Sequence, residues 1–250
     1  MYSGWTQLAA IEERNLNVIV GVSYKGGPIE LREFGAVSED GISPEARQVD
    51  INSITKTVTG VMAAKLVQQG KAKLDETLEN FFENVPEDKS GITLHQLLTH
   101  SAGFRHSVGQ DFERLDRNDF LARALQSDLE SAPGEKYEYS NVGYGIVTAI
   151  IETRSDKSYE RYLHEDVIAG LELKDTGYAS VYDENRSLRT KGGETIEKAS
   201  WGGYKPYWNL IGNGGLISTA QDMIRFRQAV ISGEVVSQKM LEIIQTPHIK

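Results

Sequence analysis

The segment from Ser53 to Gly70 constrains the fold of this chain more than any other. Several of its residues recur at helical spacing, namely Val58, Val61, Met62, Leu66 and Gln69. Gly70 then stands where helices commonly end, because glycine tolerates the left-handed backbone of a C-terminal cap. The spacing therefore predicts a helix from Ile54 to Gln69 that begins directly after Ser53.

Ser53 and Lys56 form a Ser-x-x-Lys pattern at the start of this predicted helix. Residues three apart share a helix face, so the hydroxyl and the amine would lie one turn apart. A hydroxyl with a base beside it is the arrangement of a nucleophilic serine, and a helix N-terminus favours a developing negative charge. The same residues also fit an N-cap serine and a solvated surface lysine, so this pattern alone leaves both interpretations open.

Three further stretches accompany the pattern, and together they carry a family resemblance. They are Ile92 to Gly103, with Thr99-His100-Ser101-Ala102-Gly103 at its end; Pro133 to Tyr144, with Tyr139-Ser140-Asn141; and Asn213 to Met223. With these motifs the chain resembles the serine β-lactamase and penicillin-binding protein superfamily. The branch is that of class C β-lactamases, D-alanyl-D-alanine peptidases and β-lactamase-like esterases. The similarity runs from about Val18 to the C-terminus in the family's order.

The resemblance implies an α/β fold of the α+β type, with an antiparallel sheet flanked by helices and a mainly helical lobe. We expect residues 1–250 to form one domain of two lobes. Residues 1–52 and 216–250 would form the α/β lobe, which would be incomplete, and residues 53–215 would form the mainly helical lobe.

The resemblance also implies roles for four residues. Ser53 would attack a carbonyl carbon and form an acyl-enzyme, while its backbone N–H would supply half of an oxyanion hole. Lys56 would accept the proton as a neutral amine, which requires a lowered pKa. Tyr139 would be a second proton handler, and Asn141 would donate an amide hydrogen bond to the substrate or to Lys56. The substrate would be a β-lactam, a D-amino-acid peptide or an ester, and no cofactor is implied.

The chain departs from the family at the third motif, a Lys-Thr-Gly or His-x-Gly triplet on a later strand. Beyond Met223 no such triplet occurs. Trp201-Gly202-Gly203 precedes the Asn213 segment, on the wrong side in family order, and Lys25-Gly26-Gly27 and Lys191-Gly192-Gly193 are more typical of turns. A second hypothesis therefore stands beside the hydrolase: a catalytically weak or inactive penicillin-binding-like protein, or a fragment that needs a complementing C-terminal segment.

The predicted sheet also departs from that of the family. The sequence predicts strands from Asn17 to Tyr24 and from Ile29 to Val37, joined by a turn at residues 25–28. The C-terminal strands of the family are missing, and a two-stranded sheet is marginal in water. We expect the rest of the sheet to come from a second polypeptide, from a swapped copy, or from a longer product of which this chain is a part.

Periodicity and capping patterns predict further helices. These cover Gly4 to Arg14, Asp119 to Leu129, Tyr159 to Ile168, Ala220 to Ile231 and Ser237 to Gln245, with capping boxes at Thr93/Gln96 and Ser218/Gln221. Residues 176–211 are rich in Gly, Tyr and Trp and show little periodicity. Tyr204, Tyr207 and Trp208 in this stretch either line a substrate cleft or pack locally.

Composition limits the function classes. The 250 residues are 39% hydrophobic, enough for a substantial core, and the net charge of −9 argues against nucleic acid as a partner. The chain has no cysteine, and its five histidines form no metal-binding pattern. No segment reaches membrane-spanning length. No leader is evident at the N-terminus, so the compartment stays open: the protein is either cytoplasmic, or exported by a leader that this sequence does not include.

Overall fold

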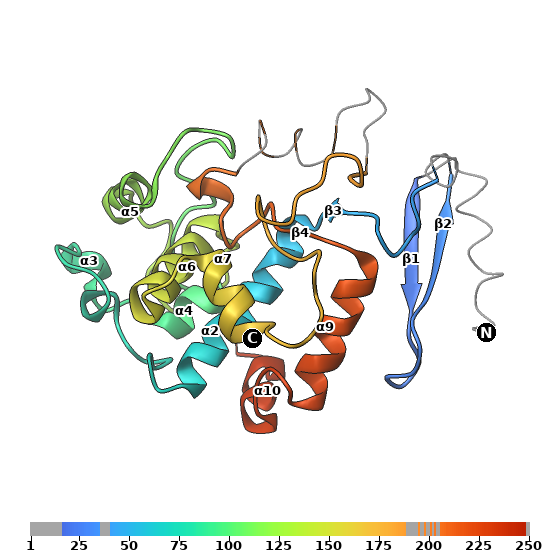
Figure 1. Cartoon of the computed structure of the whole chain (residues 1–250). Helices are drawn as coiled ribbons and strands as arrows, with labels where there is room; N and C mark the ends of the chain where they lie inside the picture. The colour runs from blue at the N-terminus through green and yellow to red at the C-terminus, as the bar shows by residue number, and fades with distance from the viewer. Residues whose placement is uncertain are drawn as a thin grey trace.

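The computed structural model describes residues 17–35, 41–188, 195, 198, 201, 203 and 206–248. Helices gather on one side of the molecule, and a β-hairpin stands at the opposite side, next to α9 (Figure 1). This is the expected mixed α+β fold. The predicted helix over residues 4–14 and the end of the second predicted strand, residues 36–37, lie outside the described residues.

The central helix is α2 (Thr55–Gln68), which follows a short 3₁₀ turn, η3 (Asn52–Ile54). Its side chains Val58, Met62 and Leu66 are almost fully buried. The helix ends as predicted: Gly70 has a φ of 71°, and the Lys71 N–H bonds to the Leu66 carbonyl over 3.1 Å. The N-terminal end of α2 is therefore held in place by a helix that is packed in the core.

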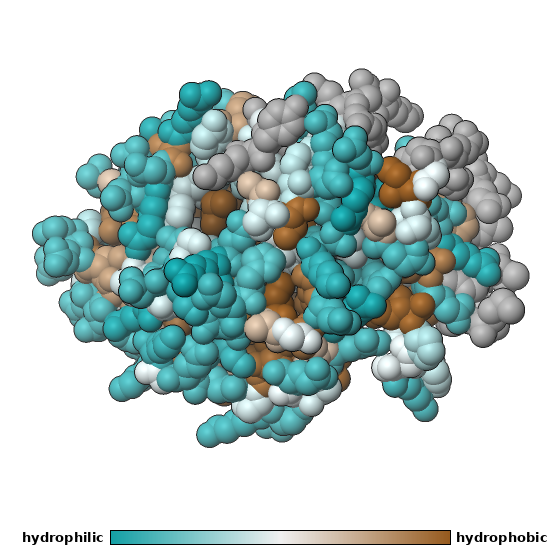
Figure 2. Space-filling view, in the orientation of Figure 1, coloured by the Kyte–Doolittle hydropathy of each residue, from teal (hydrophilic) through white to brown (hydrophobic). Residues whose placement is uncertain are grey.

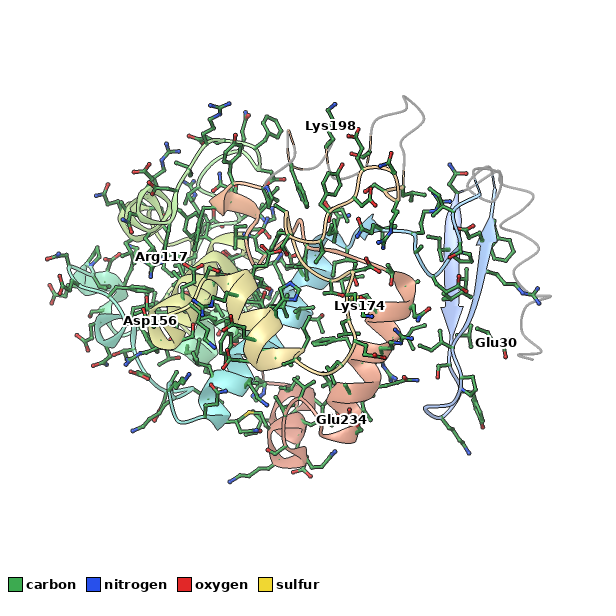
Figure 3. The ribbon with its side chains drawn as sticks, in the orientation of Figure 1. Glu30, Arg117, Asp156, Lys174, Lys198 and Glu234 are labelled. Carbon is green, nitrogen blue, oxygen red and sulfur yellow. The ribbon has the colours of Figure 1, made fainter. Side chains whose placement is uncertain are left out.

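Helix α6 (Asn141–Ser155) packs against α2, and α4 (Leu94–Leu98), α5 (Arg117–Gln126) and α7 (Tyr159–Tyr162) pack against α6. The remaining elements of the helical side are η4 (Leu78–Asn80), α3 (Glu87–Ser90), the π-helical turn η5 (Leu163–Val167) and η6 (Trp208–Leu210). Figure 3 shows the labelled Arg117 on this side and Glu30 on the hairpin, far from it. None of the helices in the described part of the chain is both long and apolar enough to cross a membrane.

Two small antiparallel sheets are present among the described residues. Strands β1 (Val18–Val22) and β2 (Glu30–Phe34) form the hairpin, with Val18 opposite Phe34 and Val22 opposite Glu30. The predicted turn is present, because the Gly27 N–H bonds to the Tyr24 carbonyl over 2.9 Å. Helix α9 (Ala220–Ser232) lies so close to β1 that a Cβ on Gly21 would approach Ile224 to 2.6 Å.

The second sheet was not predicted. It pairs β3 (Val49–Asp50) with β4 (Ile217–Ser218), and the Ile51 N–H donates to the Leu216 carbonyl over 2.9 Å. Strands of two residues show no alternation, so their sequence carries no strand signal. This pairing brings the start of α2 against the glycine-rich loop that precedes β4.

Three predictions about helices need correction. The helix predicted from Asp119 to Leu129 is α5, which runs from Arg117 to Gln126. The N-cap of α9 is Thr219, whose side chain accepts from the Asp222 N–H, whereas Ser218 lies in β4. The predicted helix from Tyr159 to Ile168 is α7 followed by η5, where the spacing changes to a π-helical turn. The Thr93/Gln96 capping box is confirmed. Helix α10 (Gln238–Gln245) follows α9 as expected.

One face of the molecule shows mainly hydrophilic residues, with hydrophobic residues in small, separated groups (Figure 2). Such a surface agrees with the high net charge of the chain, because charged and polar side chains must be placed where water reaches them. Among the described residues, the core lies instead around α2 and α6.

Candidate active site

Ser53 lies in the turn that opens α2, directly after a residue with unusual backbone geometry. Asn52 has a φ of 48°, in the left-handed region that few non-glycine residues adopt. The carboxylate of Asp50 holds this geometry by accepting the Asn52 N–H over 2.7 Å. The Ile54 and Thr55 N–H groups bond to carbonyls of this turn, whereas the Ser53 N–H has no acceptor among the described residues, so it can face a developing oxyanion. Strained backbone of this kind gathers at functional sites.

Lys56 lies one turn further along α2 and is only 6% exposed. Its Nζ lies 3.4 Å from Ser53 Oγ and donates to the Asn213 carbonyl over 2.5 Å. Burial lowers the pKa of Lys56, although the neighbouring Tyr139 and Asp111 act in the opposite direction. A lysine with a lowered pKa reaches the neutral form more readily, and only that form can accept a proton from a hydroxyl.

Tyr139 completes a cluster of three side chains. Its Oη donates to Ser53 Oγ over 2.8 Å, although the two residues are 86 positions apart in the chain. The Nζ of Lys56 lies 4.7 Å from the centre of the Tyr139 ring. The structure thus brings Ser53, Lys56 and Tyr139 together, so that both possible proton handlers lie beside one hydroxyl.

Asn141 lies two residues after Tyr139, at the first position of α6. Its backbone N–H donates to the His106 carbonyl over 2.9 Å, and Ser140 caps the helix by accepting the Gly143 N–H. The buried Oδ1 of Asn141 has no hydrogen-bond partner among the described residues. The side chain lines the pocket beside Ser53, and among the described residues no hydrogen bond joins it to Lys56. The expected donation from its amide to the substrate stays a prediction.

A pocket of about 230 Å³ opens beside Ser53. Its lining comes from Asp50, Asn52, Ser53, Asp111, Phe112, Asn141, Leu210, Asn213, Gly214 and Gly215. Two carboxylates, those of Asp50 and Asp111, therefore belong to the walls. The Phe112 side chain adds an apolar surface and is 53% exposed. The pocket can accept a small carbonyl compound with its reacting carbon near Ser53 Oγ.

The structure places two of the three aromatic residues proposed for a cleft away from Ser53. Tyr207 and Trp208 line a separate cavity of about 450 Å³, together with Tyr178 and Ile211. The Trp208 ring packs near Phe120, with their centroids 6.3 Å apart. Tyr204 lies outside the described residues.

The triplets considered as third motifs do not contribute described residues to the Ser53 pocket. Lys25 and Gly26 form the hairpin turn, and Trp201 is fully buried in the core. Residues 191–193 lie outside the described part. A further triplet of similar composition, Lys89-Ser90-Gly91, lies at the end of α3, before the tyrosine motif, rather than on a later strand.

Sequence reasoning also missed the role of His100 as a neighbour of Tyr139. Its ring stacks on that of Tyr139 with a centroid distance of 4.6 Å. The signal that could have found it is its place in the Thr-His-x-x-Gly stretch, which served only to establish the resemblance. Among the described residues, no group of three or more His, Asp or Glu could hold a metal ion.

Comparisons with known proteins point to one family. A family model described as Beta-lactamase matches residues 8–247. The D-alanyl-D-alanine-carboxypeptidase/endopeptidase AmpH of Escherichia coli is 31% identical over 202 residues, covering 74% of this chain and 49% of the relative. The chain spans about half the length of this relative. A Staphylococcus aureus protein named flp is 30% identical, and the match covers 28% of its length.

Solved structures show the same fold. The octameric penicillin-binding protein homologue of Pyrococcus abyssi superposes with a TM-score of 0.77 at 26% identity, over 100% of this chain and 61% of that one. A D-amino acid amidase of Ochrobactrum anthropi, solved with D-phenylalanine, gives a TM-score of 0.77 at 20% identity over 93% and 71%. The proteins of this group are serine hydrolases, among them peptidases, amidases and β-lactamases. Because the family model matches most of the chain, the chain belongs to the Beta-lactamase family.

Proposed function

We propose that this chain is a serine hydrolase that works through an acyl-enzyme on Ser53. The observation that carries the proposal is the convergence of two proton handlers on one hydroxyl: Tyr139 Oη at 2.8 Å and Lys56 Nζ at 3.4 Å from Ser53 Oγ. A surface serine that only caps a helix has no need of a buried amine and a phenol beside it.

In the proposed reaction, Lys56 and Tyr139 each transfer a proton once during acylation and once during deacylation. Lys56, whose pKa burial lowers, takes the Ser53 proton when it is in its neutral form, as Oγ bonds to the substrate carbonyl carbon. The Ser53 N–H donates to the oxyanion of the tetrahedral intermediate. Tyr139 passes a proton to the leaving amine or alcohol as its bond to carbon breaks. Water then attacks the acyl carbon and gives a proton to the Tyr139 phenolate. As the bond between this carbon and Oγ breaks, the Lys56 ammonium returns its proton to Oγ, which releases the acid and free Ser53.

The charges of the pocket favour one kind of substrate within the family's range of β-lactams, D-amino-acid peptides and esters. Asp50 and Asp111 line the pocket beside Ser53. Carboxylates attract an ammonium group and repel the carboxylate of a penicillin. We therefore propose an amide or ester of an amino acid with a free amine as the preferred substrate, with an apolar side chain against Phe112.

The second candidate is a penicillin-binding-like protein that binds such ligands but acylates slowly, or a part that needs a complementing segment. The observation that favours it is the two-stranded hairpin, which lacks further strands among the described residues. A second polypeptide or a swapped copy that adds strands to this hairpin would complete the sheet and could supply the other half of the oxyanion hole. The Pyrococcus abyssi homologue is octameric, so assemblies occur among similar proteins.

The test compares hydrolysis of D-phenylalanine p-nitroanilide with that of its N-acetyl form, for the wild type, Ser53→Ala and Ser90→Ala. Ser90 is a matched control, because its exposed hydroxyl only bonds to the Glu87 carbonyl. We expect activity with the free amine, little with the N-acetyl form, and loss in Ser53→Ala alone. Equal rates for both substrates would refute the amine preference. Activity that survives in Ser53→Ala would refute the proposed nucleophile, and folded protein without activity would favour the second candidate.

A further inference from the structure

His100 occupies a position where helices usually carry glycine. It follows Thr99, the C-cap of α4, and has a φ of 56°. The residue after a helix C-cap often adopts this left-handed conformation and is most often glycine, since a Cβ is unfavourable there. An imidazole at such a position has to be explained by what its side chain does.

Three interactions tie His100 to the segment that carries Tyr139. Its carbonyl accepts the Glu138 N–H over 2.7 Å, and its Nδ1 accepts the Ser140 N–H over 3.0 Å. Its ring stacks on the Tyr139 ring, with centroids 4.6 Å apart and an angle of 25° between the planes. Tyr139 is thus bracketed by backbone bonds on both sides and supported across its ring by one residue.

The bond to Ser140 fixes the protonation state of the imidazole. Because Nδ1 accepts an N–H, it carries no proton, and a neutral ring must then carry its proton on Nε2. A second proton on Nδ1 would set two donors against each other and break the bond. Burial, followed by the charge of Lys56, lowers the pKa of His100 to about 4, so the neutral ring prevails at neutral pH.

Other titratable groups around His100 agree with this state. Lys56 faces it from α2, and Tyr144 faces it from α6 at a centroid distance of 4.9 Å. Burial raises the pKa of Tyr144 to about 12, so this phenol stays neutral. Tyr137 meets the ring edge-on at 5.6 Å, and His106 stacks on Tyr139 at 5.8 Å. Among the described residues, no carboxylate contributes to the lowered pKa of His100.

We propose that His100 is a positioning residue that holds the Tyr139 hydroxyl against Ser53, and that it does so only as the neutral imidazole protonated on Nε2. The proposal deepens the proposed function, on which it rests for its effect on rate. It does not rest on that function for its structural content, because the tautomer and the placement of Tyr139 can be observed without any reaction.

Variants at position 100 separate the two side-chain attachments, while the backbone bond from Glu138 to the carbonyl remains in each of them. His100→Gly keeps the backbone conformation but loses the acceptor and the ring. His100→Asn keeps an acceptor and tolerates a positive φ, and His100→Phe keeps a ring without an acceptor. His95→Asn is the control, because His95 lies in α4, the helix that His100 follows, and its ring contacts that of His248, with centroids 4.8 Å apart.

The first measurement is the rate at which Ser53 reacts with a fluorophosphonate. It is combined with kcat and KM for the hydrolysis of D-phenylalanine p-nitroanilide. We expect His100→Gly to lose about 100-fold in labelling rate and in kcat with little change in KM, the cost of a misplaced proton handler. His100→Asn should recover part of the loss, to within about tenfold of the wild type. Wild-type rates in a folded His100→Gly would overturn the proposal, as would a loss of the same size in His95→Asn.

The second measurement is NMR of the wild type with ¹⁵N-labelled histidine and ¹³C-labelled tyrosine. We expect His100 as the Nε2–H tautomer, and a Tyr139 ring signal that shifts in His100→Gly and stays nearer its place in His100→Phe. An Nδ1–H tautomer, or a Tyr139 signal unmoved by His100→Gly, would overturn the proposal. If the wild type never reacts with the fluorophosphonate, the proposed hydrolase fails, while these spectra still decide the role of His100.

Discussion

Removing one oxygen atom from Tyr139 separates its chemical role from its structural one. In Tyr139→Phe the Oη that lies 2.8 Å from Ser53 Oγ is gone, whereas the ring that faces Lys56 and stacks on His100 remains. A positioned proton handler contributes about 10²- to 10⁴-fold to a rate. We therefore expect kcat/KM to fall by at least about 100-fold, equivalent to about 2.7 kcal/mol of transition-state stabilisation.

The stability of Tyr139→Phe should change little. Tyr139 is 37% exposed and Ser53 is exposed as well, so water can replace the lost donor at Ser53 Oγ. We expect the free energy of unfolding to fall by less than about 1 kcal/mol, within the usual range for one hydrogen bond. Chemical denaturation of both proteins measures this, and it separates a catalytic loss from partial unfolding.

Tyr144→Phe is the matched control. Its Oη donates to the Leu98 carbonyl over 3.0 Å, away from Ser53, and its ring lies 5.8 Å from Lys56 Nζ. Removal of this buried hydroxyl leaves a carbonyl without its donor and should cost about 1 kcal/mol of stability, with kcat/KM within a few-fold of the wild type. The reasoning is refuted if Tyr139→Phe retains wild-type kcat/KM, or if both variants lose activity equally.

Two further predictions concern charge and backbone. The Asp111 carboxylate favours the protonated form of Lys56, so Asp111→Asn should lower the Lys56 pKa further. The acid limb of the pH–rate profile should then move to lower pH, and a move to higher pH would contradict the assignment of Lys56 as the base. Gly70→Ala forces a Cβ onto a φ of 71° with open space around it, so it should destabilise by about 1 kcal/mol. Gly60→Ala, inside α2 with equally open space, should instead stabilise by up to about 1 kcal/mol; thermal unfolding that shows the same sign for both would refute the backbone argument.

Local patterns in the sequence predicted the elements that hold the nucleophile. The apolar spacing after Ser53 and the glycine at position 70 both describe α2, because helix period and helix end are set within a few residues. The Thr93/Gln96 box describes the start of α4 for the same reason. These predictions needed no knowledge of what the elements pack against.

Features that depend on long-range contact could not be predicted in this way. Strands β3 and β4 have two residues each and exist only because residues 49–50 and 217–218 meet. The spacing of Ser218 and Gln221 predicts a capping box one residue too early, because Ser218 pairs with β3 and Thr219 caps α9. The cavity beside Tyr207 and Trp208 likewise depends on where the glycine-rich loop folds back.

In the candidate site too, local sequence patterns predicted some features, while others depend on long-range contacts. The motifs named Ser53, Lys56, Tyr139 and Asn141, but spacing along the chain cannot give the distances among them. In the sequence, His100 stood out only as part of the Thr-His-x-x-Gly stretch, and Asp111 carried no signal of its own. Their importance follows from the stacking on Tyr139 and from the shared pocket.

The most direct test of the central claim is the intact mass of the protein after exposure to a fluorophosphonate, for the wild type, Ser53→Ala and Ser90→Ala. The reagent phosphonylates an activated serine hydroxyl with loss of fluoride. We predict one adduct in the wild type and in Ser90→Ala, mapped to Ser53, and none in Ser53→Ala. An adduct of equal yield in Ser53→Ala, or folded wild-type protein that stays unmodified, would contradict the claim that Ser53 is an activated nucleophile.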